Sequence, residues 1–151
     1  MQISAEATSM TVALQQGFVM VGSSGTDTYR QILVEQYLDS RPDLTRRFST
    51  VIPTSKSTEG VSVAYSDQET IFVLADEKQD NNNHDIYLVE LSSDGKEKLG
   101  EMRFGSVEGD DLAGAVRVMP DGRVAIFGTI QLETQKKMML TLISPSGSFS
   151  E

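Results

Sequence analysis

Three short apolar runs recur along the chain at a constant spacing. They read GFVMVG, TIFVLA and RVAIFG, and the small residue that closes each run falls at Gly22, Ala75 and Gly128, so that both intervals are 53 residues. Runs of this length between turn residues are typical of strands, and no segment shows helical periodicity. The pattern predicts an all-β chain of three similar units, approximately residues 1–53, 54–106 and 107–151.

The third unit shows how a unit divides into strands. Pro120-Asp121-Gly122 predicts a tight hairpin turn, because proline presets φ and Asp-Gly accepts the backbone geometry that such a turn requires. The run that follows, Val124 to Phe127, is apolar at every position, which predicts a strand covered on both faces. We therefore expect Phe127 to be buried, together with Phe72 and Val19 at nearby positions of the other units.

The second unit supplies a third and a fourth strand. Asp85 to Leu91 is rich in β-formers and ends at the turn Ser93-Asp94-Gly95. Lys96 to Phe104 has few apolar positions among its charges, which suits an outer edge strand. Four strands that become more polar along the chain, repeated with a period near 50, are typical of β-propeller blades.

The sequence therefore predicts three four-stranded antiparallel propeller-type blades, within a single domain or part of one. The third blade is expected to lack its outer strand, because only residues 148–151 follow Gly147. Closed propellers have about four to eight blades, so three repeats are too few for a ring. We expect the two open apolar faces to be covered by a second copy, as a homodimer, or by further blades of a longer propeller. A β-sandwich is the alternative, and it would place the three central strands in fewer than three sheets.

Charge and composition narrow the range of partners. The chain of 151 residues has a net charge of −9, and the second unit carries −6 of it. This acidity disfavours nucleic acid as a partner, since phosphates require a basic surface. No apolar run approaches the ~20 residues of a membrane helix. The absence of cysteine excludes disulfides and thiolate chemistry.

A second pattern runs from Asp85 to Thr129 and has the form D-x-Y-L, D-G, D-D and D-G-x-x-x-x-x-G. The positions that carry it are Asp85, Tyr87, Leu88, Gly95, Gly105, Asp110, Asp111, Asp121, Gly122 and Gly128. The stretch resembles a bacterial family of β-propeller repeats found in secreted proteins and surface lipoproteins. It departs from the family pattern at Glu90, where lysine is common, and at Ser106, which interrupts a Gly-Gly step. The resemblance implies a propeller and an extracytoplasmic setting (secreted, periplasmic or cell-surface), and it implies no reaction.

The densest acidic cluster comprises Glu108, Asp110 and Asp111. Paired carboxylates serve in glycoside hydrolysis or bind divalent cations, and these three are the candidate binding residues. The competing interpretation is structural, with Asp110 or Asp111 accepting backbone N–H bonds at the crossover between blades. That interpretation is favoured because Ser57-Thr58 occupies the equivalent place in the second unit, and hydroxyl groups make such bonds without acting as acids.

A second polar segment, QDNNNHD, holds weaker candidates. Asp80, Asn82 and Asp85 offer the oxygen ligands that calcium prefers, but the segment lacks the glycine and the terminal glutamate of an EF-hand. We therefore expect a solvated loop and no cofactor. Calcium is the one metal ion that these oxygens would suit. His84 is the only histidine, and its polar surroundings make a catalytic triad an unfavoured interpretation.

These features favour a non-enzymatic binding module whose loops are presented to a protein, peptide or glycan. No catalytic residue is assigned, because no nucleophile stands with a base in the sequence. The alternative is a carboxylate-based glycan hydrolase or lyase that acts at the mouth of the central channel, with Glu108, Asp110 and Asp111 as its acids. Convergence of carboxylates from different units around one substrate would favour the enzyme.

Overall fold

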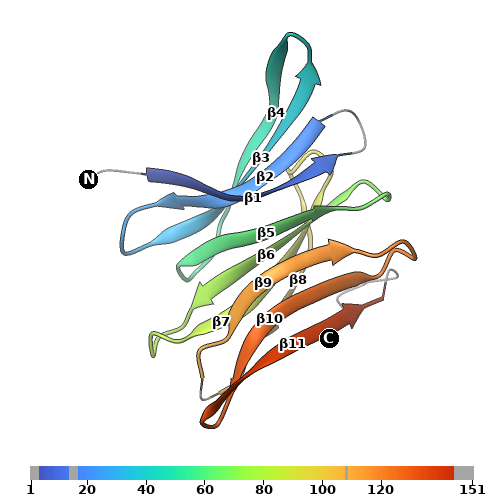
Figure 1. The fold of residues 1–151 in the computed structure, drawn as a ribbon. Coiled ribbons are helices and arrows are strands. Elements are labelled where there is room, and N and C mark those ends of the chain that lie inside the picture. Colours follow the sequence, from blue (N-terminus) through green and yellow to red (C-terminus); the bar gives the residue numbers. More distant parts are fainter. Residues whose placement is uncertain (1–3, 14–16, 108, 145–151) are drawn as a thin grey trace.

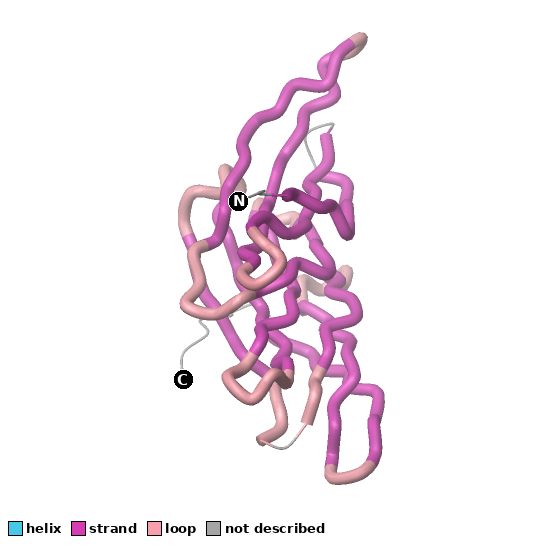
Figure 2. The backbone as a smooth tube through the Cα atoms, turned by 90° about the vertical axis from the view of Figure 1, so that its left-hand side faces the viewer, coloured by secondary structure: helices cyan, strands magenta, loops and turns pink. Residues whose placement is uncertain are grey.

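The computed structural model describes residues 4–13, 17–107 and 109–144. In these ranges the chain forms strands and loops, with no helix and therefore none that would cross a membrane (Figure 2). The strands are β1 (Ser4–Ala13), β2 (Gly17–Gly25), β3 (Arg30–Ser40), β4 (Asp43–Ile52), β5 (Thr58–Tyr65), β6 (Thr70–Lys78), β7 (His84–Ser92), β8 (Lys98–Phe104), β9 (Leu112–Val118), β10 (Val124–Leu132) and β11 (Gln135–Ile143). The all-β prediction is confirmed.

The strands form three antiparallel sheets, one for each 53-residue unit. Sheet 1 has the order β1-β2-β3-β4, sheet 2 has β5-β6-β7-β8, and sheet 3 has β9-β10-β11. Within each sheet, strands that follow one another in the sequence pair with one another, because short turns join antiparallel strands directly. The four, four and three strands agree with the prediction for the described residues, whereas residues 148–151, on which the missing outer strand was argued, lie outside them.

Turn residues end the strands where the sequence predicts turns. Gly122 adopts φ +84° and its N–H donates to the Met119 carbonyl at 2.8 Å. Gly95 adopts φ +69° at the next predicted turn. The weaker turn of the second unit is formed at Glu69, whose φ is +60° and whose N–H donates to Ser66. The corresponding turn of the first unit falls on residues 14–16, outside the described ranges.

Sheet 2 lies between sheet 1 and sheet 3, so both of its faces are covered (Figure 1). Odd-numbered residues of β6 such as Ile71 and Val73 pack with sheet 1, and even-numbered ones such as Phe72 and Leu74 pack with sheet 3. This alternation is the two-residue period of a strand. The continuous apolar run of β6 is therefore explained by two separate cores, one on each side of the sheet.

A β-bulge recurs at the same place in the first strand of each sheet. The register shifts between Ala7 and Ser9 in β1, between Gly60 and Ser62 in β5, and opposite Phe127/Gly128 in β9. At each internal contact between sheets, the residue before the bulge donates its N–H to a side chain of the preceding sheet. Gly60 donates to Ser23 Oγ at 3.1 Å. Ala113 donates to Asp76 Oδ1 at 2.6 Å. The two contacts are therefore copies of one arrangement.

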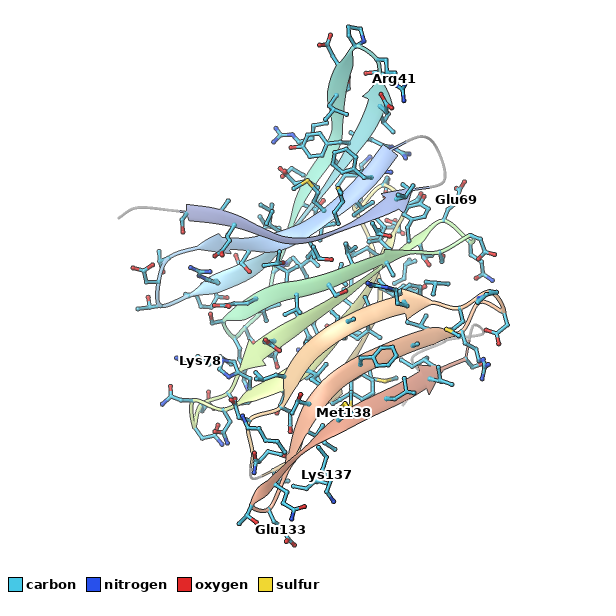
Figure 3. All side chains as sticks on the ribbon, viewed as in Figure 1. Arg41, Glu69, Lys78, Glu133, Lys137 and Met138 are labelled. Atoms are coloured by element: carbon cyan, nitrogen blue, oxygen red, sulfur yellow. The ribbon has the colours of Figure 1, made fainter. Side chains whose placement is uncertain are left out.

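The prediction that Phe127 is buried is wrong. Val19 and Phe72 are 0% and 8% exposed, as predicted, but Phe127 is 45% exposed. Phe127 projects from the face of sheet 3 that is turned away from sheet 2, where Met138 of β11 also lies (Figure 3). The described part of the chain places no further sheet over this outer face, so an apolar strand that is covered on both sides in sheet 2 is covered on one side here.

Candidate functional site

The two polar segments singled out in the sequence meet at one end of the sheets. The loop between β6 and β7 and the crossover from β8 to β9 border an open hollow of about 340 Å³. Its lining residues are Gln79, Asp80, Asn81, Asn83, Asp85, Ser106, Val107 and Gly109. Asp80 and Asp85 therefore line the hollow, whereas Asn82 belongs to the same loop but not to the lining, and Glu108 lies outside the described residues.

The loop between β6 and β7 is a tight turn built by asparagines. Gln79 N–H donates to the Asn83 carbonyl at 2.7 Å, and Asn82 N–H donates to the Gln79 carbonyl at 3.0 Å. Asn82 adopts φ +66°, a left-handed conformation that asparagine tolerates better than most residues. Asn81 Oδ1 accepts the N–H of Asn83 at 3.0 Å. The asparagine run thus serves the turn, and Asp80 stands beside it at the rim.

Asp111 fixes the crossover between sheet 2 and sheet 3. Its side chain is fully buried, and its Oδ1 accepts the N–H of Gln131 at 2.6 Å while its Oδ2 accepts the N–H of Ser106. Its own N–H donates to the His84 carbonyl at 2.8 Å. One carboxylate therefore joins the crossover to β10, which confirms the structural role favoured from the sequence.

Asp110 binds the first residue of β7. Its Oδ1 lies 3.0 Å from the His84 backbone nitrogen and 2.8 Å from His84 Nδ1. The hydrogen bond from the His84 ring is the main cause that holds the pKa of Asp110 below its ordinary value. In the preceding unit Ser57 Oγ accepts the N–H of Arg30 at 2.9 Å. A hydroxyl group thus makes the equivalent bond, as the comparison of units predicted.

Asp85 has a different environment from Asp110 and Asp111. Burial raises the pKa of the Asp85 carboxyl, and the nearby negative charges of Asp111 and Glu77 raise it further. The Ser106 Oγ beside it is buried and has no hydrogen-bond partner among the described residues. Asp85 is therefore the carboxyl group of the hollow whose proton affinity its surroundings increase.

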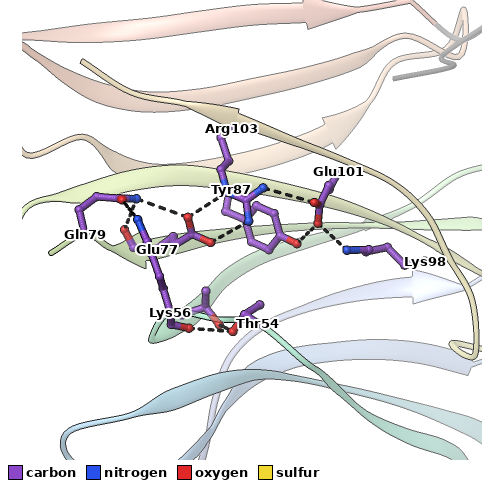
Figure 4. A network of polar contacts seen from close by, with 9 residues as sticks. Thr54, Lys56, Glu77, Gln79, Tyr87, Lys98, Glu101 and Arg103 are labelled. Carbon is purple, nitrogen blue, oxygen red and sulfur yellow. Dashed lines mark hydrogen bonds and ion pairs between the residues drawn. The ribbon is translucent and has the colours of Figure 1, made fainter. Parts of the chain in front are cut away.

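A network of polar contacts reaches the hollow through Gln79 (Figure 4). Glu77 is 2% exposed, and its two carboxylate oxygens lie 2.9 and 3.0 Å from Nε and Nη2 of Arg103. Arg103 lies over the Tyr87 ring, 4.3 Å from its centre. Gln79 Nε2 approaches Glu77 Oε1 at 3.4 Å, and Lys56 donates to Gln79 Oε1. The network therefore orients Gln79, which lines the hollow.

A second hollow, of about 580 Å³, lies on the other side of the crossover. It is lined by Ser106, Val107, Gln131, Leu132, Glu133, Thr134, Gln135 and Lys137. Ser106 and Val107 belong to both hollows, and Val107 is 96% exposed. Val107 is a residue of the site that was not expected from the sequence, although a lone apolar residue in the acidic segment SVEGDD is a signal that would have found it.

Carboxylates from two units lie near one another at this crossover, since the charge of Asp111 raises the pKa of the Asp85 carboxyl. Asp80 and Asp85 come from the second unit, and Asp110 and Asp111 come from the third. The last two are engaged with backbone N–H groups. Within the described ranges no group of three or more acidic, histidine or cysteine side chains is placed to hold a metal ion, and calcium binding stays a prediction.

Comparisons with known proteins add no relationship to this geometry. No protein-family model matches the chain, and no curated protein matches its sequence. The resemblance to a bacterial propeller-repeat family therefore stays a prediction that rests on the residues quoted for it.

Proposed function

We propose that the chain is a non-enzymatic propeller-type module that binds a protein, peptide or glycan outside the cytoplasm. The observation that carries this proposal is Val107, an almost fully exposed apolar side chain between two polar hollows. Exposed apolar residues that polar groups surround are common in recognition surfaces. The same loop is held from below by Asp111, so it is presented on a fixed support.

The lining of the first hollow favours a ligand rich in hydrogen-bonding groups. Asp80 and Asp85 supply carboxylate oxygens, and Asn81 and Asn83 supply amide groups. Sugar hydroxyls and peptide N–H groups are the ligands that such oxygens and amides recognise. Calcium bound at Asp80 and Asp85 would serve the same purpose by bridging the loop to a sugar.

Asp110 and Asp111, two of the acids of the hydrolase alternative, support binding over hydrolysis. A general acid or base must reach the reacting atom and exchange its proton during the reaction. Asp110 accepts two hydrogen bonds from His84, and Asp111 accepts bonds from Gln131 and Ser106. Donors already occupy both carboxylates, which suits a scaffold whose loops are held rigidly.

A glycan array and a peptide-display library tested against the purified chain would examine this proposal. We expect a ligand whose binding weakens about tenfold or more in Val107→Ser and in Asp85→Asn, since each removes a contact at the loop end. Asp67→Asn is the matched control, because Asp67 is an exposed acid in the β5–β6 turn at the opposite end of sheet 2. Equal loss in the control, or turnover of a bound glycan, would contradict the proposal.

A further inference from the structure

We propose that the outer face of sheet 3 binds the outer face of sheet 1 of a second copy, in the register of the internal contacts between sheets. The outer face of sheet 3 is the one that carries Phe127, Met138, Leu140 and Leu142. The outer face of sheet 1 is the one that carries Met10, Val12, Met20, Leu33 and Val51. This contact involves surfaces distinct from the hollows and does not depend on the ligand proposed above.

The 53-residue repeat shows that these two faces are the two halves of one contact. Phe127 occupies the position of Leu74 in sheet 2, and Leu74 faces sheet 3. Leu74 in turn occupies the position of Val21, which faces sheet 2. The outer face of sheet 3 is therefore the face that receives a following sheet in each earlier unit.

The converse holds for sheet 1. Met20 projects from its outer face and occupies the position of Val73, which packs against sheet 1, and of Ile126, which packs against sheet 2. The outer face of sheet 1 is therefore the face that covers a preceding sheet in each later unit. In the internal contacts, a face of each kind is covered by a neighbouring sheet. Within the described residues, no sheet covers the outer face of sheet 1 or that of sheet 3.

Large apolar side chains are exposed on both outer faces. On sheet 3, Met138, Leu140 and Leu142 are 94%, 60% and 47% exposed. On sheet 1, Met10 and Val12 are 64% and 79% exposed. By contrast Leu74, at an equivalent internal position, is 0% exposed. Two large apolar faces on one small chain are more than an isolated soluble protein commonly presents.

Backbone hydrogen bonds fix the register. The acceptor side chains at the two internal contacts are Ser23 and Asp76, which are 53 residues apart. The residue 53 positions after Asp76 is Thr129. The donor N–H groups are those of Gly60 and Ala113, and the preceding member is Ala7. We therefore place the Ala7 N–H of one copy on Thr129 Oγ1 of the other.

A second bond repeats in the same way. Ser57 Oγ accepts the N–H of Arg30, and Asp110 Oδ1 accepts the N–H of His84. Each donor pairs with a residue at the end of the second strand of its sheet: Arg30 pairs with Gly25, and His84 pairs with Lys78. In sheet 3 the residue 53 positions after Lys78 is Gln131, and it pairs with Lys136. Ser4 precedes Ser57 by the same interval. The Lys136 N–H is therefore placed on Ser4 Oγ of the second copy.

The shape of the two faces agrees with this register. The outer face of sheet 1 has a hollow of about 160 Å³, lined in part by Ala7, Met20 and Leu33. The residue of sheet 2 that is equivalent to Ala7 is Gly60, and Val21 of sheet 1 packs closely against it. A Cβ on Gly60 would lie 2.7 Å from Val21 Cγ2. The hollow thus receives Phe127, the counterpart of Val21.

The two outer faces differ in the charges that they carry. Arg117 and Lys136 project from the outer face of sheet 3, and no carboxylate does so from its strands. The outer face of sheet 1 carries Glu35 and Asp39, which form ion pairs with Arg46 and Arg41. The two cations of sheet 3 therefore meet a face that offers carboxylates.

Two copies are the smallest number that satisfies both faces. A two-fold axis would form the same contact twice and give six sheets, which lies within the range of about four to eight for closed propellers. The ring would leave no apolar sheet face exposed.

Light scattering on the whole chain tests the contact. We expect a mass of twice 16.5 kDa at micromolar concentration. Phe127→Asp and Met10→Asp should each raise the dissociation constant about 100-fold or more, because an unpaired carboxylate is costly in an apolar contact. Both side chains are exposed in the single chain, so circular dichroism should be unchanged. Leu99→Asp is the control, on an exposed residue of sheet 2.

Mixing distinguishes this head-to-tail contact from a pairing of like faces. A mixture of the Phe127→Asp and Met10→Asp variants restores one unaltered contact and should form heterodimers that neither variant forms alone. Because the chain has no cysteine, Ala7→Cys and Thr129→Cys chains should become disulfide-linked on mixing and oxidation. A monomer at micromolar concentration, a dimer that resists Met10→Asp, or polymers that grow with concentration would each overturn the proposal.

Discussion

Glu77 and Arg103 form a two-point ion pair across sheet 2, with Nε and Nη2 of Arg103 2.9 and 3.0 Å from the two carboxylate oxygens of Glu77. The Glu77 side chain is buried and the Arg103 side chain is 42% exposed. The pair is therefore asymmetric, because water can solvate Arg103 if its partner is lost but cannot easily reach Glu77.

This asymmetry predicts unequal effects of the two truncations. Arg103→Ala leaves an uncompensated buried carboxylate and should lower the free energy of unfolding by about 3 kcal/mol. Glu77→Gln leaves a partly hydrated cation and should cost about 1–2 kcal/mol. Urea unfolding of both variants measures the difference. Arg123→Ala, which removes an exposed pair with Asp121, is the control and should leave the free energy of unfolding nearly unchanged. Equal costs for Arg103→Ala and Arg123→Ala would show that the buried pair has no special weight.

The lowered pKa of Glu101 predicts that the stability of the fold depends on pH. Hydrogen bonds from Lys98 and Tyr87 lower its pKa from 4.5 to about 2. Since the folded pKa is depressed, the stabilisation is present above pH 4.5 and is lost as the pH falls toward 2. Glu101→Gln should therefore be less stable than the wild type at neutral pH, and the difference should shrink between pH 4.5 and pH 2. Thermal unfolding over this pH range measures it. A difference that is constant with pH would exclude Glu101 as its source.

Phe72 and Phe127 provide a matched pair for the role of sheet stacking. Phe72→Ala empties a site between two sheets and should cost about 3–5 kcal/mol, whereas Phe127→Ala on an open face should cost less than about 1 kcal/mol in the single chain. Both are to be measured in the Met10→Asp background, in which we expect a monomer. Similar costs in that background would mean that Phe127 is covered within one chain.

We expect the hydrogen bonds of Asp111 to stabilise the crossover between sheet 2 and sheet 3. Asp111→Ala leaves the N–H groups of Gln131 and Ser106 without their acceptor and should cost about 2–4 kcal/mol. Asp110→Ser should cost less than about 1 kcal/mol, since Ser57 makes the equivalent bond in the preceding unit. Hydrogen exchange at the Gln131 amide reports the first loss directly. Unchanged protection of this amide in Asp111→Ala would contradict the assigned bond.

The sequence by itself determined the features that depend on neighbouring residues. The 53-residue spacing predicts three sheets, and glycines at Gly95 and Gly122 predict their turns, because left-handed backbone conformations are a local property. The role of Asp110 and Asp111 was also predictable, since the hydroxyls of Ser57-Thr58 at the equivalent place showed that a hydrogen-bond acceptor suffices there.

Tertiary structure alone decided which apolar faces are covered and which loops share a site. Phe127 and Phe72 stand in similar apolar runs, yet one is exposed and the other buried, because burial depends on whether another sheet lies over the strand. Likewise Asp80 and Val107 are far apart in sequence and line one hollow only because β6, β7 and the crossover end together. A repeat specifies the surface that each sheet presents, but the number of sheets that assemble decides what that surface meets.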